Sequence, residues 1–336
     1  MRENAAVRLR PRHAFRAARL VACAVIGALA GGGALASAEA RPMVLGQPAT
    51  IVGANTSFVA PGHRKVILGT RHKDVILGTR GKDWIVSNGG RDVIDGGPGD
   101  DVIIGGSNPS ERRHDDPSKL IGGRGRDYID GGWDADLIVG DRAKLSARVS
   151  GAADRDQIDG EFGGDLIVGD NYSARDASGG ADDFIRAQNG GDTVIGDSAV
   201  TGNGTAEGGA DDHFESSSGN DLVVGDSYSP KGKAVGGGND QMSTGPGEDL
   251  VVGDSYTETG TAQGGGDDEL HMLAGDDVGY GDDYAGDGGQ AVGGGEDAIG
   301  GGPGVDWLFA GPAFDRCNGG PDPDHIRDCE AKLSGG

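Results

Sequence analysis

A nine-residue period is the feature of this sequence that most limits its fold. From residue 69 the chain divides into four consecutive nines, Gly69–Leu77, Gly78–Val86, Ser87–Asp95 and Gly96–Ile104. Position 6 is Asp and position 8 is Ile in all four. A short fixed period is typical of solenoids, in which each repeat is stabilised by stacking on its neighbours.

After an insertion expected at residues 105–121, the pattern continues in a longer unit. Pairs of nines begin at residues 122, 151, 178, 207, 235, 263 and 292. A linker of 9 to 11 residues follows each of the first six pairs, and every one of these linkers opens with Gly-Asp. We therefore expect an N-terminal repeat block at 60–121, units of about 28 residues at 122–309 and a C-terminal cap at 310–336.

Each nine combines a turn with a short strand. Gly at positions 1, 2 and 4 permits a tight turn, and positions 7 to 9 form a strand whose position 8 points inward. Gly279 leaves an interior gap, which we expect Tyr280 to fill. Two nines complete a coil. The sequence predicts an all-β fold, a parallel β-roll or β-helix solenoid with the linkers on one edge.

The Asp at position 6 lies where a turn enters a strand. Neighbouring coils place these carboxylates ~4.8 Å apart, so the rows repel themselves unless a cation neutralises them. Calcium takes about six to eight oxygens from carboxylates and carbonyls, whereas magnesium demands stricter octahedral geometry. The predicted calcium ligands are Asp74, Asp83, Asp92, Asp101, Asp127, Asp136, Asp156, Asp165, Asp183, Asp192, Asp212, Asp221, Asp240, Asp249, Asp268, Asp277, Asp297 and Asp306.

Several turns resemble a known repeat family. GGPGDDVII (96–104), GGRGRDYID (122–130) and GGPGVDWLF (301–309) are similar to the RTX, or haemolysin-type, calcium-binding nonapeptide G-G-x-G-x-D-x-U-x. The resemblance spans roughly residues 69–327. It implies a parallel β-roll, calcium held between turns by the Asp side chains and turn carbonyls, and calcium-dependent folding. It implies weaker sites where position 4 is not Gly, at His72, Asp134, Asp154, Ala181, Ala210 and Ala313.

Residues 1–38 have the pattern of a secretory signal. Six arginines precede an apolar run from Leu20 to Ala36, and small residues follow. The alternative is a membrane anchor, for which the run is short. We expect a secreted or cell-surface protein, with an N-terminal linker at 39–59 and no membrane span after cleavage.

The two ends of the repeat array look like caps. Lys65 replaces Asp in the nine at 60–68, so no calcium is expected there. Cys317 and Cys329 lie 12 residues apart. In an oxidising compartment such a pair predicts a disulfide.

The two strands of each pair differ at their outward positions. Second strands carry apolar residues such as Leu166 and Val168, whereas first strands carry polar ones such as Gln157 and Asp159. An apolar sheet of this size needs a cover. Either the linkers fold over it or a partner protein does, and we favour the linkers.

These features favour a non-enzymatic calcium-binding protein. The net charge of −24 attracts cations and repels nucleic acid. One alternative is an adhesion or envelope-structural protein that uses the linker edge or the apolar sheet to bind a cell-envelope partner. Another is a hydrolase in the linkers, because the Gly-Asp-Ser blocks at Ser198, Ser227 and Ser255 resemble an esterase nucleophile. Such a nucleophile needs a positioned His base, and recurrence in phase with the repeat is typical of a structural feature.

Overall fold

The structure is a computed structural model. It describes residues 66–70, 72–105, 117–144 and 147–333, together with the backbone of four short strands between residues 43 and 59. The expected signal at 1–38 and Lys65 lie outside the described residues. All elements of the described part are strands, and no helix there is long and apolar enough to cross a membrane.

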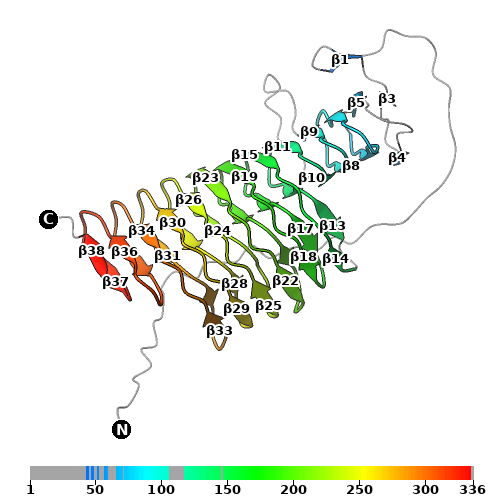
Figure 1. The fold of residues 1–336 in the computed structure, drawn as a ribbon. Coiled ribbons are helices and arrows are strands. Elements are labelled where there is room, and N and C mark those ends of the chain that lie inside the picture. Colours follow the sequence, from blue (N-terminus) through cyan, green and yellow to red (C-terminus); the bar gives the residue numbers. More distant parts are fainter. Residues whose placement is uncertain are drawn as a thin grey trace. The chain divides into compact units, whose positions relative to one another are not determined.

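Two long parallel sheets form the solenoid (Figure 1). Sheet I has 13 strands: β3 (Ile51–Val52), β5 (Val66–Leu68), β7 (Trp84–Val86), β9 (Val102–Ile104), β11 (Tyr128–Trp133), β15 (Gln157–Phe162), β19 (Phe184–Asn189), β23 (His213–Ser218), β26 (Gln241–Ser243), β30 (Glu269–His271), β34 (Ala298–Gly300), β36 (Arg316–Asn318) and β38 (Ala331–Leu333).

Sheet II has 12 strands that alternate with those of sheet I along the chain. They are β4 (Ser57–Val59), β6 (Val75–Leu77), β8 (Val93–Pro98), β10 (Lys119–Arg124), β12 (Leu137–Val139), β16 (Leu166–Val168), β20 (Thr193–Ile195), β24 (Leu222–Val224), β27 (Leu250–Val252), β31 (Val278–Tyr280), β35 (Trp307–Phe309) and β37 (His325–Arg327). The alternation confirms the predicted β-roll, with each nine supplying one strand. A separate antiparallel pair joins β1 (Met43–Val44) and β2 (Gln47–Pro48).

The linkers form strands of their own. Sheet III contains β13 (Arg142–Lys144), β17 (Asn171–Ser173) and β21 (Ala199–Val200), and isolated bridges through Tyr228 lead on to β28 (Tyr256–Thr257) and β32 (Tyr284–Ala285). Sheet IV contains β14 (Val149–Ser150), β18 (Ala177–Ser178), β22 (Thr205–Glu207), β25 (Lys233–Val235), β29 (Thr261–Gln263) and β33 (Gln290–Val292).

The linker strands pack against the outer face of sheet II. Val139, Val168 and Ile195 on that face are fully buried, and they form one apolar cluster with Tyr172 and Ala199 of the linkers. Along the opposite sheet, outward residues such as Gln157 and Glu269 are exposed. The structure thus covers the apolar sheet with the chain itself in the coils that carry linkers.

The solenoid interior consists of the apolar side chains at position 8, which form one file from each of the two sheets. Ile138, Ile167 and Val194 are in direct register across β12, β16 and β20, and none is more than 2% exposed. The expectation that Tyr280 fills the gap at Gly279 is wrong. Met272 fills it, because a Cβ on Gly279 would lie 2.7 Å from the Met272 methyl carbon.

Two boundaries differ from the expected ones. β10 begins inside the expected insertion 105–121, with Leu120 in register with Ile94 and Ile138. This nine escaped detection because Ser118 replaces Asp at position 6. The parallel pairing of β3 with β5 and of β4 with β6 also extends the roll into the expected linker 39–59.

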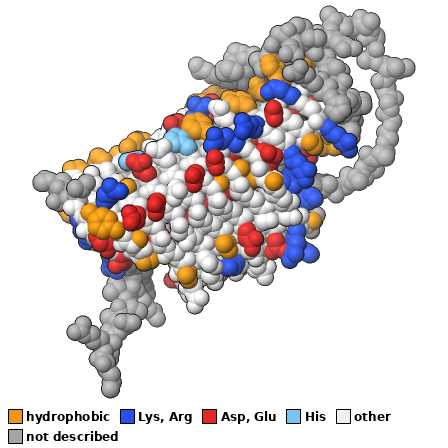
Figure 2. Space-filling model, in the orientation of Figure 1, with side chains coloured by type: hydrophobic (Ala, Val, Ile, Leu, Met, Phe, Trp, Pro, Cys, Tyr) orange, Lys and Arg blue, Asp and Glu red, His pale blue; other side chains and the backbone are white. Residues whose placement is uncertain are grey.

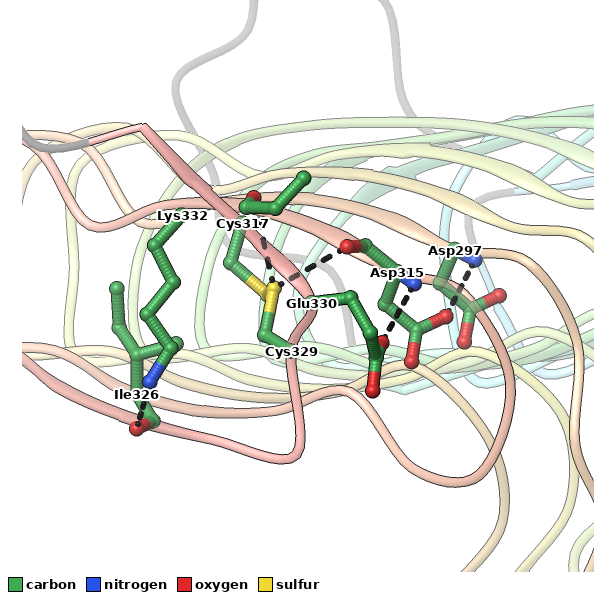
Figure 3. The surroundings of a disulfide bond; sticks show 8 residues. Asp297, Asp315, Cys317, Ile326, Cys329, Glu330 and Lys332 are labelled. Carbon is green, nitrogen blue, oxygen red and sulfur yellow. Dashed lines mark hydrogen bonds between the residues drawn. A yellow bond between two sulfur atoms is a disulfide. The ribbon is translucent and has the colours of Figure 1, made fainter.

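The C-terminal coil carries the expected disulfide between Cys317 and Cys329, whose Cα atoms are 6.3 Å apart (Figure 3). The bond ties the buried Cys317 of β36 to the segment that leads into β38. It holds the last coil against the open end of the stack, where no further coil follows among the described residues.

The burial of the position-8 side chains leads to a prediction about stability. Ile158→Ala should lower the free energy of unfolding by about 2–5 kcal/mol, because the side chain is fully buried and truncation leaves a cavity. Chemical denaturation in saturating calcium measures this change. Val292→Ala, at a position that is 58% exposed, is the control and should change it by less than about 0.5 kcal/mol. Equal effects of the two substitutions would contradict the packing described here.

Candidate metal-binding rows

The position-6 aspartates form two buried rows along the solenoid. Row I precedes the strands of sheet I and contains Asp83, Asp101, Asp127, Asp156, Asp183, Asp212, Asp240, Asp268, Asp297 and Asp315. Row II precedes the strands of sheet II and contains Asp74, Asp92, Asp136, Asp165, Asp192, Asp221, Asp249, Asp277, Asp306 and Asp324. All 18 predicted ligands are at most 4% exposed. Figure 2 accordingly shows acidic side chains only in scattered groups on the face in view.

One oxygen of each carboxylate joins successive coils. The backbone N–H of Asp127 donates to Oδ1 of Asp156 at 2.7 Å, and the N–H of Asp156 donates to Oδ1 of Asp183 at 2.7 Å. The same bond recurs along both rows at 2.6 to 3.1 Å. At the end of row I, the Asp315 N–H donates to Glu330, which caps the row (Figure 3).

The other oxygen, Oδ2, takes no part in this hydrogen bond between coils. Within the described residues it has no hydrogen-bond donor in Asp101, Asp127, Asp156, Asp165, Asp183, Asp192, Asp212, Asp240, Asp268, Asp277, Asp297, Asp306 and Asp315. A buried carboxylate oxygen without a donor is costly. Its repetition along two rows points to a ligand.

In row I, Oδ2 lies close against a glycine that directly follows positions 7 to 9 of a sheet II strand, where there is no room for a Cβ atom. A Cβ atom built on Gly169 would lie less than 3.0 Å from Oδ2 of Asp183 and from the carbonyl oxygen of Gly196 in the next coil. We call this close approach of the two oxygens to a glycine the glycine gap. It recurs at Gly78, Gly96, Gly122, Gly140, Gly196, Gly225, Gly253 and Gly281.

The residues present fit a calcium ion. The glycine gap brings a carboxylate oxygen and a backbone carbonyl together in each coil, and these are the oxygens that calcium prefers. No three or more His, Cys, Asp or Glu side chains among the described residues converge as a cage. Backbone carbonyls would therefore complete the coordination, as the turn glycines allow.

In its later coils, row II has other residues in place of the glycine. Ala187, Ser216, Thr244 and Met272 take the position of the first glycine before Asp192, Asp221, Asp249 and Asp277. The Ser216 hydroxyl donates to Oδ2 of Asp221. In these coils the residue that follows positions 7 to 9 carries a side chain in sheet I, whereas it stays glycine in sheet II. This residue therefore distinguishes the two rows, which the sequence alone did not lead us to expect.

The N-terminal coils are also weaker candidates. Oδ2 of Asp74 accepts from the Thr70 N–H at 2.5 Å, and Oδ2 of Asp83 accepts from the Thr79 N–H at 2.5 Å. These predicted ligands therefore already have local donors.

A family profile described as RTX calcium-binding nonapeptide repeat (4 copies) matches residues 68–108, 119–143 and 235–255. The chain carries RTX calcium-binding nonapeptide repeats. The second match begins at Lys119, where the structure starts β10. A search of curated proteins found no match.

The RTX rows contain residues that the sequence analysis did not select as ligands. Asp315 is fully buried, accepts the N–H of Asp297 through Oδ1 and has an Oδ2 without a donor. Its phase with Cys317 at position 8 was the available signal. Ser118 takes the Asp position of row II, where its hydroxyl accepts the N–H of Asp92 at 3.3 Å.

Burial dominates the electrostatics of the RTX rows. It raises the pKa of Asp101 to about 7, of Asp165 to about 8 and of Asp127 to about 10. The neighbouring carboxylate of Asp156 raises the pKa of Asp127 further. Burial also raises the pKa of Asp183 well above its usual value of 3.8. Without a cation, these groups favour protonation over charge.

These shifts predict the pH dependence of the calcium-free protein. The folded-state pKa values lie above the ordinary value of 3.8, so protonation of these aspartates stabilises the folded state. This contribution to the free energy of unfolding is fully present below about pH 3.8 and is lost as the pH rises towards about 7 to 10. In calcium-depleted buffer, far-ultraviolet circular dichroism should show more β-structure at about pH 4 than at about pH 8. The opposite order would contradict the burial of the rows.

Proposed function

We propose that this chain is a secreted, non-enzymatic calcium-binding protein whose bound ions drive the folding of the roll. The observation that carries the proposal is the row of buried Oδ2 atoms that face the glycine gaps of row I. The charge of the chain, −24, has the sign that calcium requires.

Unneutralised carboxylates in successive coils repel each other, and burial increases that repulsion by lowering the effective dielectric constant. The ions supply the positive charge that offsets this repulsion. The chain positions the ligands: Oδ1 is fixed by the N–H of the preceding coil, so Oδ2 is held towards the turn carbonyls.

The Gly-Asp-Ser blocks fit a structural role better than a nucleophilic one. Ser198 is fully buried, and its hydroxyl donates to the carbonyl oxygen of Gly179 at 3.0 Å. Ser227 and Ser255 are likewise buried and donate to Gly208 and Gly236. A nucleophile would instead need an exposed hydroxyl and a base beside it, which supports a non-enzymatic role over a hydrolase in the linkers.

Secretion is supported by the Arg-rich and apolar N-terminus and by the disulfide, which suits an oxidising compartment. Linker strands occupy the apolar face of sheet II in the coils that carry linkers. An envelope partner would therefore meet the linker edge.

Calcium removal is the test of the proposal. Circular dichroism and calorimetric titration should show that chelator at neutral pH abolishes the β-signal, and that calcium but not equimolar magnesium restores it. An unchanged spectrum in chelator, with no heat of calcium binding, would refute the proposal.

The difference between the two rows gives a sharper prediction. Asp183→Asn keeps an oxygen for the Asp156 N–H but removes the charge that faces the glycine gap of Gly169. It should raise the calcium concentration for half-maximal folding about tenfold, since ligand charge sets affinity.

Asp221→Asn is the matched control. Its Oδ1 also accepts a row hydrogen bond, from the Asp192 N–H at 2.8 Å, but Ser216 occupies the space beside it. We expect a shift of less than about threefold. Equal shifts in the two variants would show that the glycine gap does not select the ion sites.

A further inference from the structure

A third row of carboxylates runs beside row I and lies outside the nonapeptide. The Asp that follows the first Gly of each linker is at most 6% exposed in every case. These residues are Asp141, Asp170, Asp197, Asp226, Asp254 and Asp282. We call them the Gly-Asp row.

Side chains of this row close the base of a linker with hydrogen bonds. Oδ2 of Asp170 accepts the Ala181 N–H at 3.0 Å, Oδ1 of Asp254 accepts the Gly266 N–H at 2.9 Å, and Oδ1 of Asp282 accepts the Gly295 N–H at 2.7 Å. Within the described residues, the second oxygen of these three carboxylates is buried without a donor, so the linker closure explains only half of each of the three. In Asp197 and Asp226, by contrast, both oxygens accept backbone N–H groups.

The Gly-Asp row and row I share their turns. The glycine of each Gly-Asp pair is the glycine of the gap itself, as Gly169 is for Asp183. The carboxylates that act most strongly on Asp226 belong to Asp240 of row I and to Asp197 and Asp254 in the adjoining coils. From the first linker onward, each coil thus brings two buried carboxylates to one place.

Backbone carbonyls also line the Gly-Asp row. A Cβ on Gly236 would lie less than 3.0 Å from both the carbonyl oxygen of Gly208 and the side chain of Asp226. Gly264 has the same relation to Gly236 and Asp254. A backbone carbonyl oxygen, which is a ligand type that suits calcium, therefore lies near Asp226 and near Asp254.

We propose that Asp170, Asp254 and Asp282 are calcium ligands that act together with row I. The inference rests on the proposed calcium binding and extends it to residues outside the nonapeptide. Asp141 differs because the positive charges of Arg142 and Arg124 act on it. The coils with linkers would hold more calcium than their nonapeptides alone.

The competing explanation is that neighbouring Gly-Asp carboxylates share protons and hold the linkers together as neutral pairs. The two explanations differ in what Asn does. Asn keeps an oxygen for the position-4 N–H, so the linker closure survives, but it cannot supply a charged ligand. Loss of bound calcium with an intact fold distinguishes a ligand from a proton-sharing pair.

The test uses the full chain and the double variant Asp170→Asn/Asp254→Asn. Equilibrium dialysis with elemental analysis measures bound calcium at a concentration that saturates the unaltered protein, and circular dichroism reports the fold. We expect the loss of about two ions per chain, one for each carboxylate removed, with the β-signal retained. Glu207→Gln, at an exposed position on β22 of sheet IV, is the control for the loss of a carboxylate outside the three rows and should bind as much calcium as the unaltered protein.

Two outcomes overturn the inference. If the double variant binds as much calcium as the unaltered protein with the same midpoint, the Gly-Asp row holds protons or hydrogen bonds alone. If the double variant loses its β-signal, the single variant Asp254→Asn replaces it, and unchanged calcium binding there counts equally against the inference. Absence of calcium binding by the unaltered protein would instead refute the proposed function.

Discussion

The hydrogen bond from the backbone N–H of one aspartate to the Oδ1 atom of the next is the interaction on which this roll depends. It links each coil to its neighbour where the turn becomes a strand, along both sheets. The bond uses a carboxylate in nearly every coil, with Ser118 as the exception, and the stacking buries that carboxylate. The fold therefore creates the charge problem that a cation would resolve. Structure and ion binding are in this sense one property of the repeat.

The two rows meet this constraint in different ways. Row I keeps glycine beside the carboxylate through nearly the whole stack, so Oδ2 and a backbone carbonyl of the next coil approach each other with no Cβ between them. Row II replaces glycine with Ala187, Ser216, Thr244 and Met272 in consecutive coils. The Met272 side chain fills the interior at Gly279, and the Ser216 hydroxyl satisfies a carboxylate. Row II thus exchanges ligand space for packing, while the linkers enclose row I.

Much of the candidate site could be predicted from the sequence because a strict period turns a local pattern into a spatial one. All 18 predicted aspartates lie in the two rows. The coil of Ser118 could not be predicted from a repeat defined by Asp at position 6. A serine hydroxyl accepts the same backbone N–H there. The expectation of weaker sites where position 4 is not Gly also considered only the turn itself. Ala181 serves its linker as Gly266 does, through a backbone N–H that needs no special residue.

The sequence by itself determined the repeat, the strand positions, the inward apolar file and the aspartate rows. These follow from residue order, because a strand alternates its side chains and equal repeats stack in register. Only the tertiary structure decided what lies between coils: which oxygen is used, where two oxygens approach a glycine, and where the linkers pack. Such contacts join residues 18 to 29 positions apart, so they depend on the stacked geometry and not on local preference. The Gly-Asp pairs illustrate the limit, since their recurrence was plain in the sequence but their burial beside row I was not.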